Sequence, residues 1–297
     1  MQVAIVSLSS CLGCQMVFLS LGDFFYRFIG ENRIVYAPFF VDGRDFPEVE
    51  LALVEGTVRN SGHFLKAREV REKAGRVVAL GTCACFGGVQ GLADGFSEET
   101  LIRRRFGETD MENAPRGIRR LLPLDSYIKV DAFLPGCPPD SDLLKGFLEM
   151  VLAGEVPERP GSTVCSQCRV TSPELPQPGP RRVTAEPPRP GACLLESGYL
   201  CMGPLTRDGC GARCPSAMGV PCHGCRGPSD AAMTPAVDIL GETVRRLSRA
   251  TGRRESEVAA AVTDPAHSCY LFCMAEPSLR RRRPGGTAPF IHRLESR

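Results

Sequence analysis

Several features that would assign a protein to a class at first reading are missing from this sequence. No apolar run approaches the roughly eighteen residues of a membrane-spanning helix, so no membrane span is expected. The N-terminus, MQVAIVSLSSCLGC, has neither a positively charged region nor a small-residue cleavage site, so no secretory signal peptide is expected. Tryptophan is absent, and the four histidines are too scattered to indicate a site of their own.

A strong excess of charge is missing as well. The net charge of +2 indicates no nucleic-acid partner, and none is expected. The basic run Arg280–Arg283 has no interleaved aromatic residues. This pattern favours a solvated tail or a subunit contact over a phosphate-binding patch.

Cysteine is the residue present in excess. The chain has 15 cysteines, and an odd number argues against a fully paired disulfide framework. Without an export signal the chain is expected to stay in the reducing cytoplasm. There, cysteines more often bind metals or act as catalytic thiols than form disulfides.

Six of these cysteines lie in one segment of 33 residues, from Cys193 to Cys225, at spacings of eight, nine, four, eight and three. The segment shows neither strand alternation nor a helical apolar face, and Gly and Pro interrupt it throughout. It has little apolar surface with which to order itself. Thiolates at short spacings on a turning backbone are typical ligands of iron–sulfur clusters.

The first half of the chain predicts a doubly wound parallel sheet. Apolar, β-branched runs at 3–8, 33–40, 51–58, 76–80 and 131–134 are typical of buried strands. Helical patterns cover 17–29, 61–74 and 141–153. Strands that alternate with helices predict an α/β fold of the flavodoxin-like type.

Five cysteines follow directly on predicted strands. Cys11 and Cys14 follow the first strand, Cys83 and Cys85 the fourth, and Cys137 the fifth. The carboxyl ends of parallel strands share one edge of the sheet, where open α/β sheets bind their ligands. These thiols are therefore expected to converge on one site.

Composition changes near residue 155. We expect a flavodoxin-like domain over 1–155, a cysteine-rich, largely irregular iron–sulfur domain with a few helices over 156–230, and a helical segment with a basic tail over 231–297. Seven of the twenty residues from 171 to 190 are proline, which predicts an extended loop. Thr234-Pro235 predicts the start of a helix that runs to Thr251, followed by Gly252 and a short helix at 255–262.

The number of cysteines suffices for three clusters with four thiolates each. The sheet edge offers four ligands and one extra thiol, Cys85, for which a small buried side chain is favoured. The second half offers eight further cysteines, from Cys165 to Cys225. Structural zinc is an alternative for the CxxC pairs 165/168 and 222/225, but it leaves four intervening cysteines without a role. A thioredoxin-like redox pair is an alternative for Cys11 and Cys14.

Four motifs carry a resemblance to a known family. CLGC after the first strand, GTCACFGG, LPGCPP and the block from Cys193 to Pro228 resemble the small, electron-transferring subunit of nickel–iron hydrogenases. The resemblance is greatest to the cytoplasmic group of methyl-viologen-reducing and deazaflavin-reducing archaeal enzymes and sulfhydrogenases, and covers roughly residues 1–230. VEGTV at 54–58 resembles the family's acidic-glycine motif. Gln15 stands where many relatives carry an acidic residue.

The resemblance implies three 4Fe–4S clusters and no catalytic residue in this chain, because the nickel–iron site lies on a separate large subunit. The implied ligands of the proximal cluster are Cys11, Cys14, Cys83 and Cys137. Those of the medial cluster are Cys210, Cys214, Cys222 and Cys225. Those of the distal cluster are Cys165, Cys168, Cys193 and Cys201. Cys269 and Cys273 share helical spacing but lack two further partners for a fourth site.

The implied function is to conduct electrons from dihydrogen oxidation on the large subunit to an acceptor subunit, an iron–sulfur or flavin protein, or in the reverse direction. An iron–sulfur subunit of a respiratory, quinone-linked complex is the alternative, because such subunits resemble the N-terminal half. That alternative does not need the segment from Cys193 to Cys225. A zinc-stabilised scaffold without enzymatic partners is the other class considered.

Overall fold

The computed structural model describes residues 1–42, 45–107, 115–118, 120–172, 179–234 and 237–280. Backbone contacts divide the chain into two compact units. The first comprises Met1–Arg159 together with Phe272–Pro277, and the second is formed mainly by Pro160–Leu271. The three-part division expected from composition stays a prediction.

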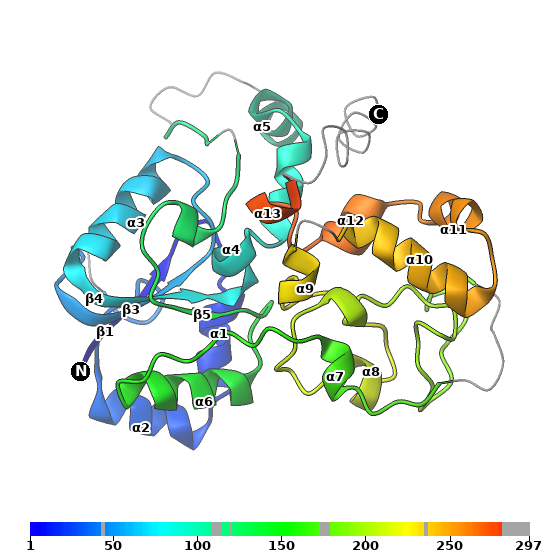
Figure 1. The fold of residues 1–297 in the computed structure, drawn as a ribbon. Coiled ribbons are helices and arrows are strands. Elements are labelled where there is room, and N and C mark those ends of the chain that lie inside the picture. The colour runs from blue at the N-terminus through cyan, green and yellow to red at the C-terminus, as the bar shows by residue number, and fades with distance from the viewer. Residues whose placement is uncertain (43–44, 108–114, 119, 173–178, 235–236, 281–297) are drawn as a thin grey trace. The chain divides into compact units, whose positions relative to one another are not determined.

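The first unit contains a five-stranded sheet. Its strands are β1 (Gln2–Ser7), β2 (Arg33–Tyr36), β3 (Val49–Glu55), β4 (Ala74–Leu80) and β5 (Ala132–Leu134). They lie in the order β2-β1-β3-β4-β5, and every neighbouring pair is parallel (Figure 1). This is the strand order of flavodoxin-like sheets, so the predicted fold class is confirmed.

Helices cover both faces of the sheet, which explains why its strands are apolar almost throughout. On one face, alternate strand residues such as Ile5 and Leu53 pack against Phe18, Phe28 and Leu144. These three come from α1 (Gly13–Leu19), α2 (Asp23–Glu31) and α6 (Ser141–Leu152). Figure 1 shows α3 (Ser61–Lys73) on the side of the sheet opposite α2 and α6.

The single helix predicted over 17–29 is wrong, because the chain forms α1 and α2 with a break between them. Gly22 precedes α2 with a φ of +56°, a conformation that glycine adopts at little cost. The break lets both helices bury a phenylalanine. The rings of Phe18 and Phe28 meet with their centroids 6.3 Å apart.

The second strand is shorter than predicted and ends at Tyr36 instead of residue 40. The chain turns there, because the amides of Phe40 and Val41 both donate to Ala37 O at 2.7 Å. Phe40 then packs against Phe25 with the ring centroids 6.2 Å apart. The apolar run therefore continues into the core around the helices instead of the sheet.

Several helices carry no clear sequence signal. α5 (Glu98–Phe106) buries none of its side chains, so it lacks the apolar periodicity that predicts a helix. α4 (Gly81–Phe86) and the 3₁₀ segment Val89–Gly95 follow β4 and are rich in glycine. A further 3₁₀ turn covers Leu124–Ser126.

The second unit is largely irregular, as predicted. It contains the short helices α7 (Val164–Gln167), α8 (Arg213–Ala217) and α9 (Asp230–Met233) and a 3₁₀ turn at Gly203–Leu205. The longer helix is α10 (Ile239–Thr251), followed by α11 (Glu255–Ala261) and α12 (Pro265–Tyr270). A last turn, α13, covers Pro277–Arg280. Val164, Leu194 and Tyr199 form a core with Val244 and Leu247 of α10.

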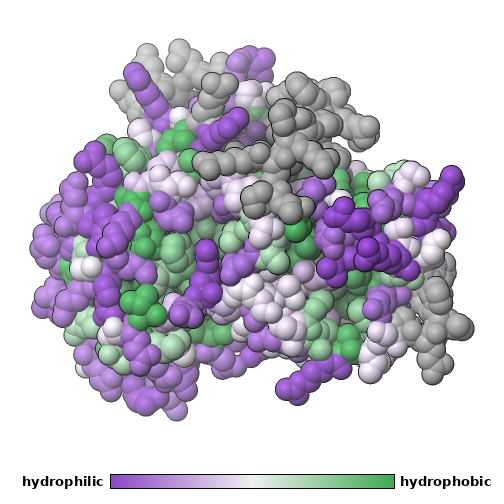
Figure 2. Space-filling model, in the orientation of Figure 1, coloured by the Kyte–Doolittle hydropathy of each residue, from purple (hydrophilic) through white to green (hydrophobic). Residues whose placement is uncertain are grey.

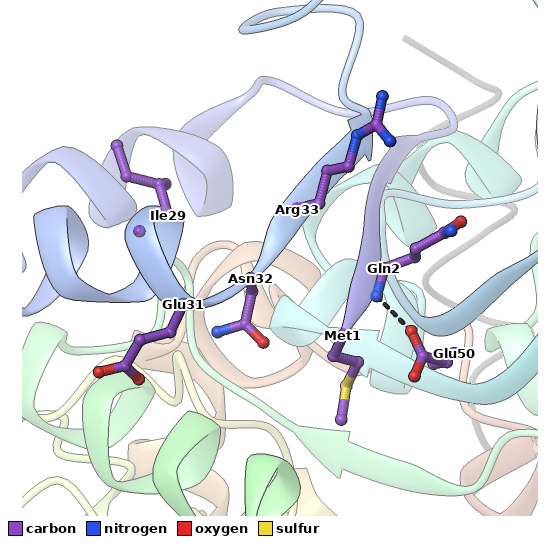
Figure 3. Close-up of a pocket in the computed structure, with 8 residues that line it drawn as sticks. Met1, Gln2, Ile29, Glu31, Asn32, Arg33 and Glu50 are labelled. Atoms are coloured by element: carbon purple, nitrogen blue, oxygen red, sulfur yellow. Dashed lines mark hydrogen bonds between the residues drawn. The ribbon is translucent and has the colours of Figure 1, made fainter.

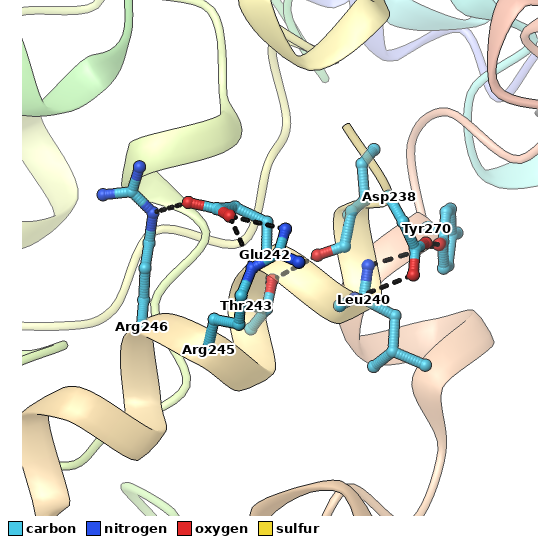
Figure 4. A network of polar contacts seen from close by, with 9 residues as sticks. Asp238, Leu240, Glu242, Thr243, Arg245, Arg246 and Tyr270 are labelled. Carbon is cyan, nitrogen blue, oxygen red and sulfur yellow. Dashed lines mark hydrogen bonds and ion pairs between the residues drawn. The ribbon is translucent and has the colours of Figure 1, made fainter. Parts of the chain in front are cut away.

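The predicted start of α10 is wrong, although its predicted end and the following helix are confirmed. Asp238 caps the helix, its carboxylate accepting from Gly241 N at 3.1 Å. Asp238 also accepts from the Tyr270 hydroxyl at 2.9 Å, which ties α12 to α10 (Figure 4). Pro235 and residues 281–283 of the basic run lie outside the described residues, as do 173–178 of the proline-rich loop.

None of the helices within the described ranges is long and apolar enough to cross a membrane. Figure 2 shows hydrophilic side chains spread widely over the face drawn there, with apolar side chains in smaller groups between them.

A carboxylate fixes the start of β5, the strand that leads to Cys137. Asp131 Oδ2 accepts from Arg71 Nη1 at 2.6 Å and from Val77 N, in β4, at 2.8 Å. Burial acts to raise the pKa of Asp131, but these hydrogen bonds outweigh it and hold the pKa below its usual value. The ionised form of the Asp131 carboxyl group therefore stabilises the folded chain.

The substitution Asp131→Asn is expected to lower the free energy of unfolding by about 1–2 kcal/mol near pH 7, because a charge-assisted hydrogen bond is lost. A carboxyl with a lowered folded pKa stabilises above its unfolded pKa and loses that contribution below it. The difference between wild type and variant should therefore shrink as the pH falls through about 4. Urea unfolding at several pH values measures this difference in the free energy of unfolding. A difference that does not change with pH would contradict the stabilising role of the ionised Asp131 carboxyl.

Candidate metal centres

A cavity of about 350 Å³ lies at the start of β1 and β2, not at the carboxyl ends of the strands (Figure 3). Met1, Asn32, Arg33 and Glu50 are among its lining residues, and no cysteine is. The candidate site is therefore not this cavity but the opposite edge of the sheet, where the cysteines of the first unit lie.

The first group of thiols, which we call the sheet-edge set, consists of Cys11, Cys14, Cys83 and Cys137. Burial raises the pKa of Cys14, and the neighbouring charges of Glu55 and the other three thiols raise it further. Burial, together with Cys137 and Cys11, raises the pKa of Cys83 to about 12. The four thiols therefore lie near enough to one another to interact electrostatically, and their shared ligation of one cluster stays a prediction.

Cys85 does not join this set. Its side chain is 1% exposed, and its Sγ donates to Ala79 O at 3.4 Å. It is the small buried side chain that the sequence favours at this position.

Glycines allow the backbone to approach two of the sheet-edge thiols closely. A Cβ on Gly81 would overlap Cys14 Sγ, and one on Gly88 would lie 2.6 Å from Cys83 Sγ. Gly81 has a φ of +82°. Because these residues have no side chain, the backbone can lie directly against the sulfurs.

The backbone turns unusually within two of the cysteine loops. Leu12, between Cys11 and Cys14, has a φ of +64°, and Ala212, between Cys210 and Cys214, has a φ of +51°. They are the non-glycine residues of positive φ in the part of the chain that the structure describes. Such conformations cost free energy and occur mostly at functional sites, so we attribute them to the orientation of the flanking thiols.

A buried carboxylate lies beside the sheet-edge set. Glu55 is 1% exposed, and its Oε1 accepts from Ser7 Oγ at 2.8 Å, Ser10 Oγ at 3.1 Å and Gln15 Nε2 at 2.8 Å. Gln15 Oε1 accepts no hydrogen bond from the described residues. The amide of Gln15 can donate to Glu55, whereas an acidic residue at this position would repel it.

The second set consists of Cys165, Cys168, Cys193 and Cys201, all in the second unit. Burial raises the pKa of Cys165 to about 12, with further contributions from the other three thiols. The pKa of Cys193 is raised by burial, Glu196 and the Cys168 thiol, and that of Cys201 by burial and the thiols of Cys193 and Cys168. These four thiols therefore interact electrostatically, and their ligation of one cluster stays a prediction.

The third set, Cys210, Cys214, Cys222 and Cys225, is present as two pairs. Burial and the Cys210 thiol raise the pKa of Cys214. Burial and the thiols of Cys201 and Cys225 raise the pKa of Cys222. An interaction between the two pairs is not among the causes of these shifts.

The second and third sets adjoin each other. Cys222 N donates to Cys201 Sγ at 3.3 Å, and Cys222 O accepts from Met202 N at 2.8 Å. A Cβ on Gly203 would lie 3.2 Å from Cys165 Sγ and 3.6 Å from Cys201 Sγ. A hydrogen-bonded bridge thus connects a ligand candidate of one set to a ligand candidate of the other.

Several side chains near these thiols carry no signal in the sequence. Ser216 Oγ donates to Cys168 Sγ at 3.7 Å, and the Thr206 hydroxyl forms a hydrogen bond with Cys222. Arg246 acts on the pKa of Cys165 from α10, where it pairs with Glu242 (Figure 4). Isolated serines, threonines and arginines form no motif, so the sequence alone could not identify them.

The remaining cysteines are buried. Burial raises the pKa of Cys269 to about 12, against a hydrogen bond from Thr243 that acts to lower it. Cys273 is also buried. Within the described ranges, no three His, Cys, Asp or Glu side chains are arranged to hold a single metal ion.

The chemistry of the three sets fits cluster ligation better than catalysis. At Cys14, Cys83 and Cys165, burial and the neighbouring thiols raise the pKa and so oppose ionisation. Polynuclear iron supplies the positive charge that would stabilise four thiolates in one place. A parallel sheet with thiols at its carboxyl edge and a cysteine-rich unit after it defines an electron-transfer protein of the oxidoreductase class.

Comparisons with known proteins agree with the assignment to the oxidoreductase class. Residues 11–151 match the family described as NADH ubiquinone oxidoreductase, 20 Kd subunit. The vhu G subunit of the F420-non-reducing hydrogenase of Methanocaldococcus jannaschii is 36% identical over 290 residues, 95% of this chain and 97% of the relative. Sulfhydrogenase 2 subunit delta of Pyrococcus furiosus is 30% identical over 229 residues, 77% of this chain and 87% of the relative.

A solved NAD+-reducing NiFe hydrogenase in the H2-reduced state is similar in structure, with a TM-score of 0.51 and 27% identity over 54% of this chain and 95% of that one. The chain belongs to the family that includes the G subunits of F420-non-reducing hydrogenases, the small, electron-transferring subunits of nickel–iron hydrogenases.

A methyl group at position 81 tests whether iron binding depends on the close approach of the Gly81 backbone to Cys14 Sγ. The variant Gly81→Ala is expected to lose about four irons per chain, since the added carbon overlaps the sulfur. Gly22→Ala is the matched control, because Gly22 has a φ of +56° but an added Cβ would meet no atom within 4 Å. Both substitutions strain the backbone by about 1–2 kcal/mol. An equal loss of iron in the two purified variants would show that backbone strain, and not the contact with the Cys14 thiol, causes the loss. Full iron content in Gly81→Ala would contradict the prediction.

Proposed function

We propose that this chain conducts electrons through three 4Fe–4S clusters between the nickel–iron centre of its large subunit and an acceptor subunit. The observations that support the proposal are the electrostatic interactions among the thiols of the sheet-edge set and among those of the second set, and the two thiol pairs of the third set. The proposed ligands are four thiolates in each set, with the sheet-edge set proximal, the third set medial and the second set distal.

Each cluster, when bound, supplies a site that accepts and releases one electron. The chain's own residues hold the cluster, exclude water from it and set its potential through hydrogen bonds, burial and charge. In the second set, Cys201 receives a hydrogen bond from the amide of Cys222, which favours the thiolate form. Because the second and third sets adjoin each other, an electron would cross only a short distance between the medial and distal clusters.

The acceptor subunit is proposed to be an iron–sulfur or flavin protein that receives electrons from the distal cluster. Cys165 is the most exposed residue of the second set, although its thiol is partly buried, and this supports an exit of electrons beside it. Electron flow in the opposite direction uses the same path. We also propose that the chain works in the cytoplasm, because none of its 15 cysteines, all of which the structure describes, forms a disulfide, and a reducing compartment keeps thiols available as ligands.

A subunit of a quinone-linked respiratory complex is the second candidate, favoured by the description of the family that matches residues 11–151. That match ends before the second and third sets. The hydrogenase relative from Methanocaldococcus jannaschii aligns over 95% of this chain, which favours the hydrogenase function. Dihydrogen-dependent reduction of methyl viologen by the purified complex separates the two, since a quinone-linked complex would show none.

The cluster content is the first measurement. Anaerobically purified protein, co-expressed with its partner subunits, is expected to contain about twelve irons and about twelve acid-labile sulfides per copy of this chain, after subtraction of the partners' content. About one zinc without sulfide would mean that the cysteines are structural. About four irons would leave only one set occupied.

Cys83 and Cys85 form a matched pair for the ligand assignment. Cys83→Ala is expected to lower the iron content by about four and to abolish electron transfer from the large subunit to dyes. Cys85→Ala, two residues away, is expected to keep the full iron content, because the Cys85 side chain is buried and its thiol donates to Ala79 O. Equal iron loss in both variants would contradict the assignment of the sheet-edge set.

A further inference from the structure

Two arginines are buried beside the third set. Arg207 is 0% exposed and Arg226 is 2% exposed. Arg207 Nη2 pairs with Asp230 Oδ1 at 2.6 Å, so a carboxylate matches its charge. An arginine keeps its charge at every accessible pH, so both guanidinium groups are buried cations.

Arg226 lies next to a residue of each pair of the third set along the chain or in space. It follows Cys225 directly in the sequence, and its Nε donates to Asp208 O at 2.6 Å. Its Nη2 would lie 2.8 Å from a Cβ on Gly209, the residue before Cys210. The guanidinium therefore lies against the turn that leads into Cys210, while its own backbone adjoins Cys225.

The local backbone holds this arrangement. Arg207 N donates to Gly227 O at 3.0 Å, and Thr206 and Pro228 form an antiparallel bridge, so the segments at 206–209 and 226–228 run side by side. The Gln167 Oε1 atom accepts from Gly209 N at 2.9 Å and Gly211 N at 3.0 Å. The turn before Cys210 is thus fixed from two sides, and it keeps its contact with Arg226.

Charge explains why an arginine suits this position. A cluster bound by four thiolates carries net negative charge, which increases by one electron on reduction. A cation in a desolvated setting stabilises the reduced form more than the oxidised form and so raises the reduction potential. Conversely, nearby negative charge offsets the desolvation of a buried guanidinium.

We infer that Arg226 is the buried cation that raises the reduction potential of the cluster held by the third set. This inference rests on the proposed function, since it requires a cluster at Cys210, Cys214, Cys222 and Cys225. It assigns Arg226 the role of keeping that cluster reducible within the path between the other two.

The test is a redox titration, followed by EPR, of the anaerobically purified complex carrying Arg226→Gln. The signal of the third set is the one that disappears in Cys214→Ala. At a fixed potential, Arg226→Gln is expected to lower the ratio of reduced to oxidised cluster about tenfold, equivalent to about 59 mV for one electron. Arg226→Lys keeps the charge and is expected to stay near the wild-type ratio.

Arg213→Gln is the matched control. Arg213 lies between Cys210 and Cys214 but is exposed, so solvent and salt screen its charge and the ratio should change little. Full iron content with an unchanged ratio in Arg226→Gln would overturn the inference. An equal shift in Arg226→Gln and Arg226→Lys would overturn it too, because packing and not charge would then be responsible.

If Arg226→Gln loses iron, the variant Gly209→Ala provides the test instead. Its added carbon displaces the Arg226 guanidinium, while the positive charge of Arg226 remains in the protein. That variant should lower the ratio in the same direction, and an unchanged ratio with full iron would refute the inference. Failure of the proposed function is recognised separately, by a wild-type iron content well below about twelve per chain.

Discussion

The charge of crowded thiols is the constraint on which the rest of the structure depends. Burial and neighbouring thiols raise the pKa of Cys14, Cys165 and Cys222, so these groups resist ionisation while no cation is near. Any group that binds them must bring positive charge, and the surroundings must tolerate what negative charge remains. Two hydrogen-bond donors to the thiols meet this need: the amide of Cys222, which donates to Cys201, and the hydroxyl of Ser216, which donates to Cys168.

The two units meet this constraint in different ways. In the first unit, a rigid parallel sheet delivers Cys14, Cys83 and Cys137 from separate strands, and the apolar core beneath offsets the cost of ordering. In the second unit, the cysteine-bearing segments have little regular structure, and α10 supplies much of the apolar contact through Val244 and Leu247. The C-terminal helices therefore support the second unit, and the hydrogen bond from Tyr270 to Asp238 holds α12 on α10.

Local patterns account for the correct predictions, and contacts across the chain account for the wrong ones. The strands were identified because burial on both faces makes them apolar runs. The break at Gly22 and the early end of β2 at Tyr36 were missed, since the packing of Phe18 on Phe28 and of Phe40 on Phe25 decides them. α5 was missed because none of its side chains is buried.

The sequence by itself determined the fold class, the family and which cysteines are candidates, because these depend on the order and spacing of residues along the chain. The tertiary structure alone decided what lies beside each thiol: the hydrogen bonds of Glu55 with Gln15, the contact of Cys222 with Cys201, and the place of Arg226 against Gly209. The physical reason is that electrostatic interactions depend on distance and burial in space. Spacing along the chain determines neither for residues on separate turns.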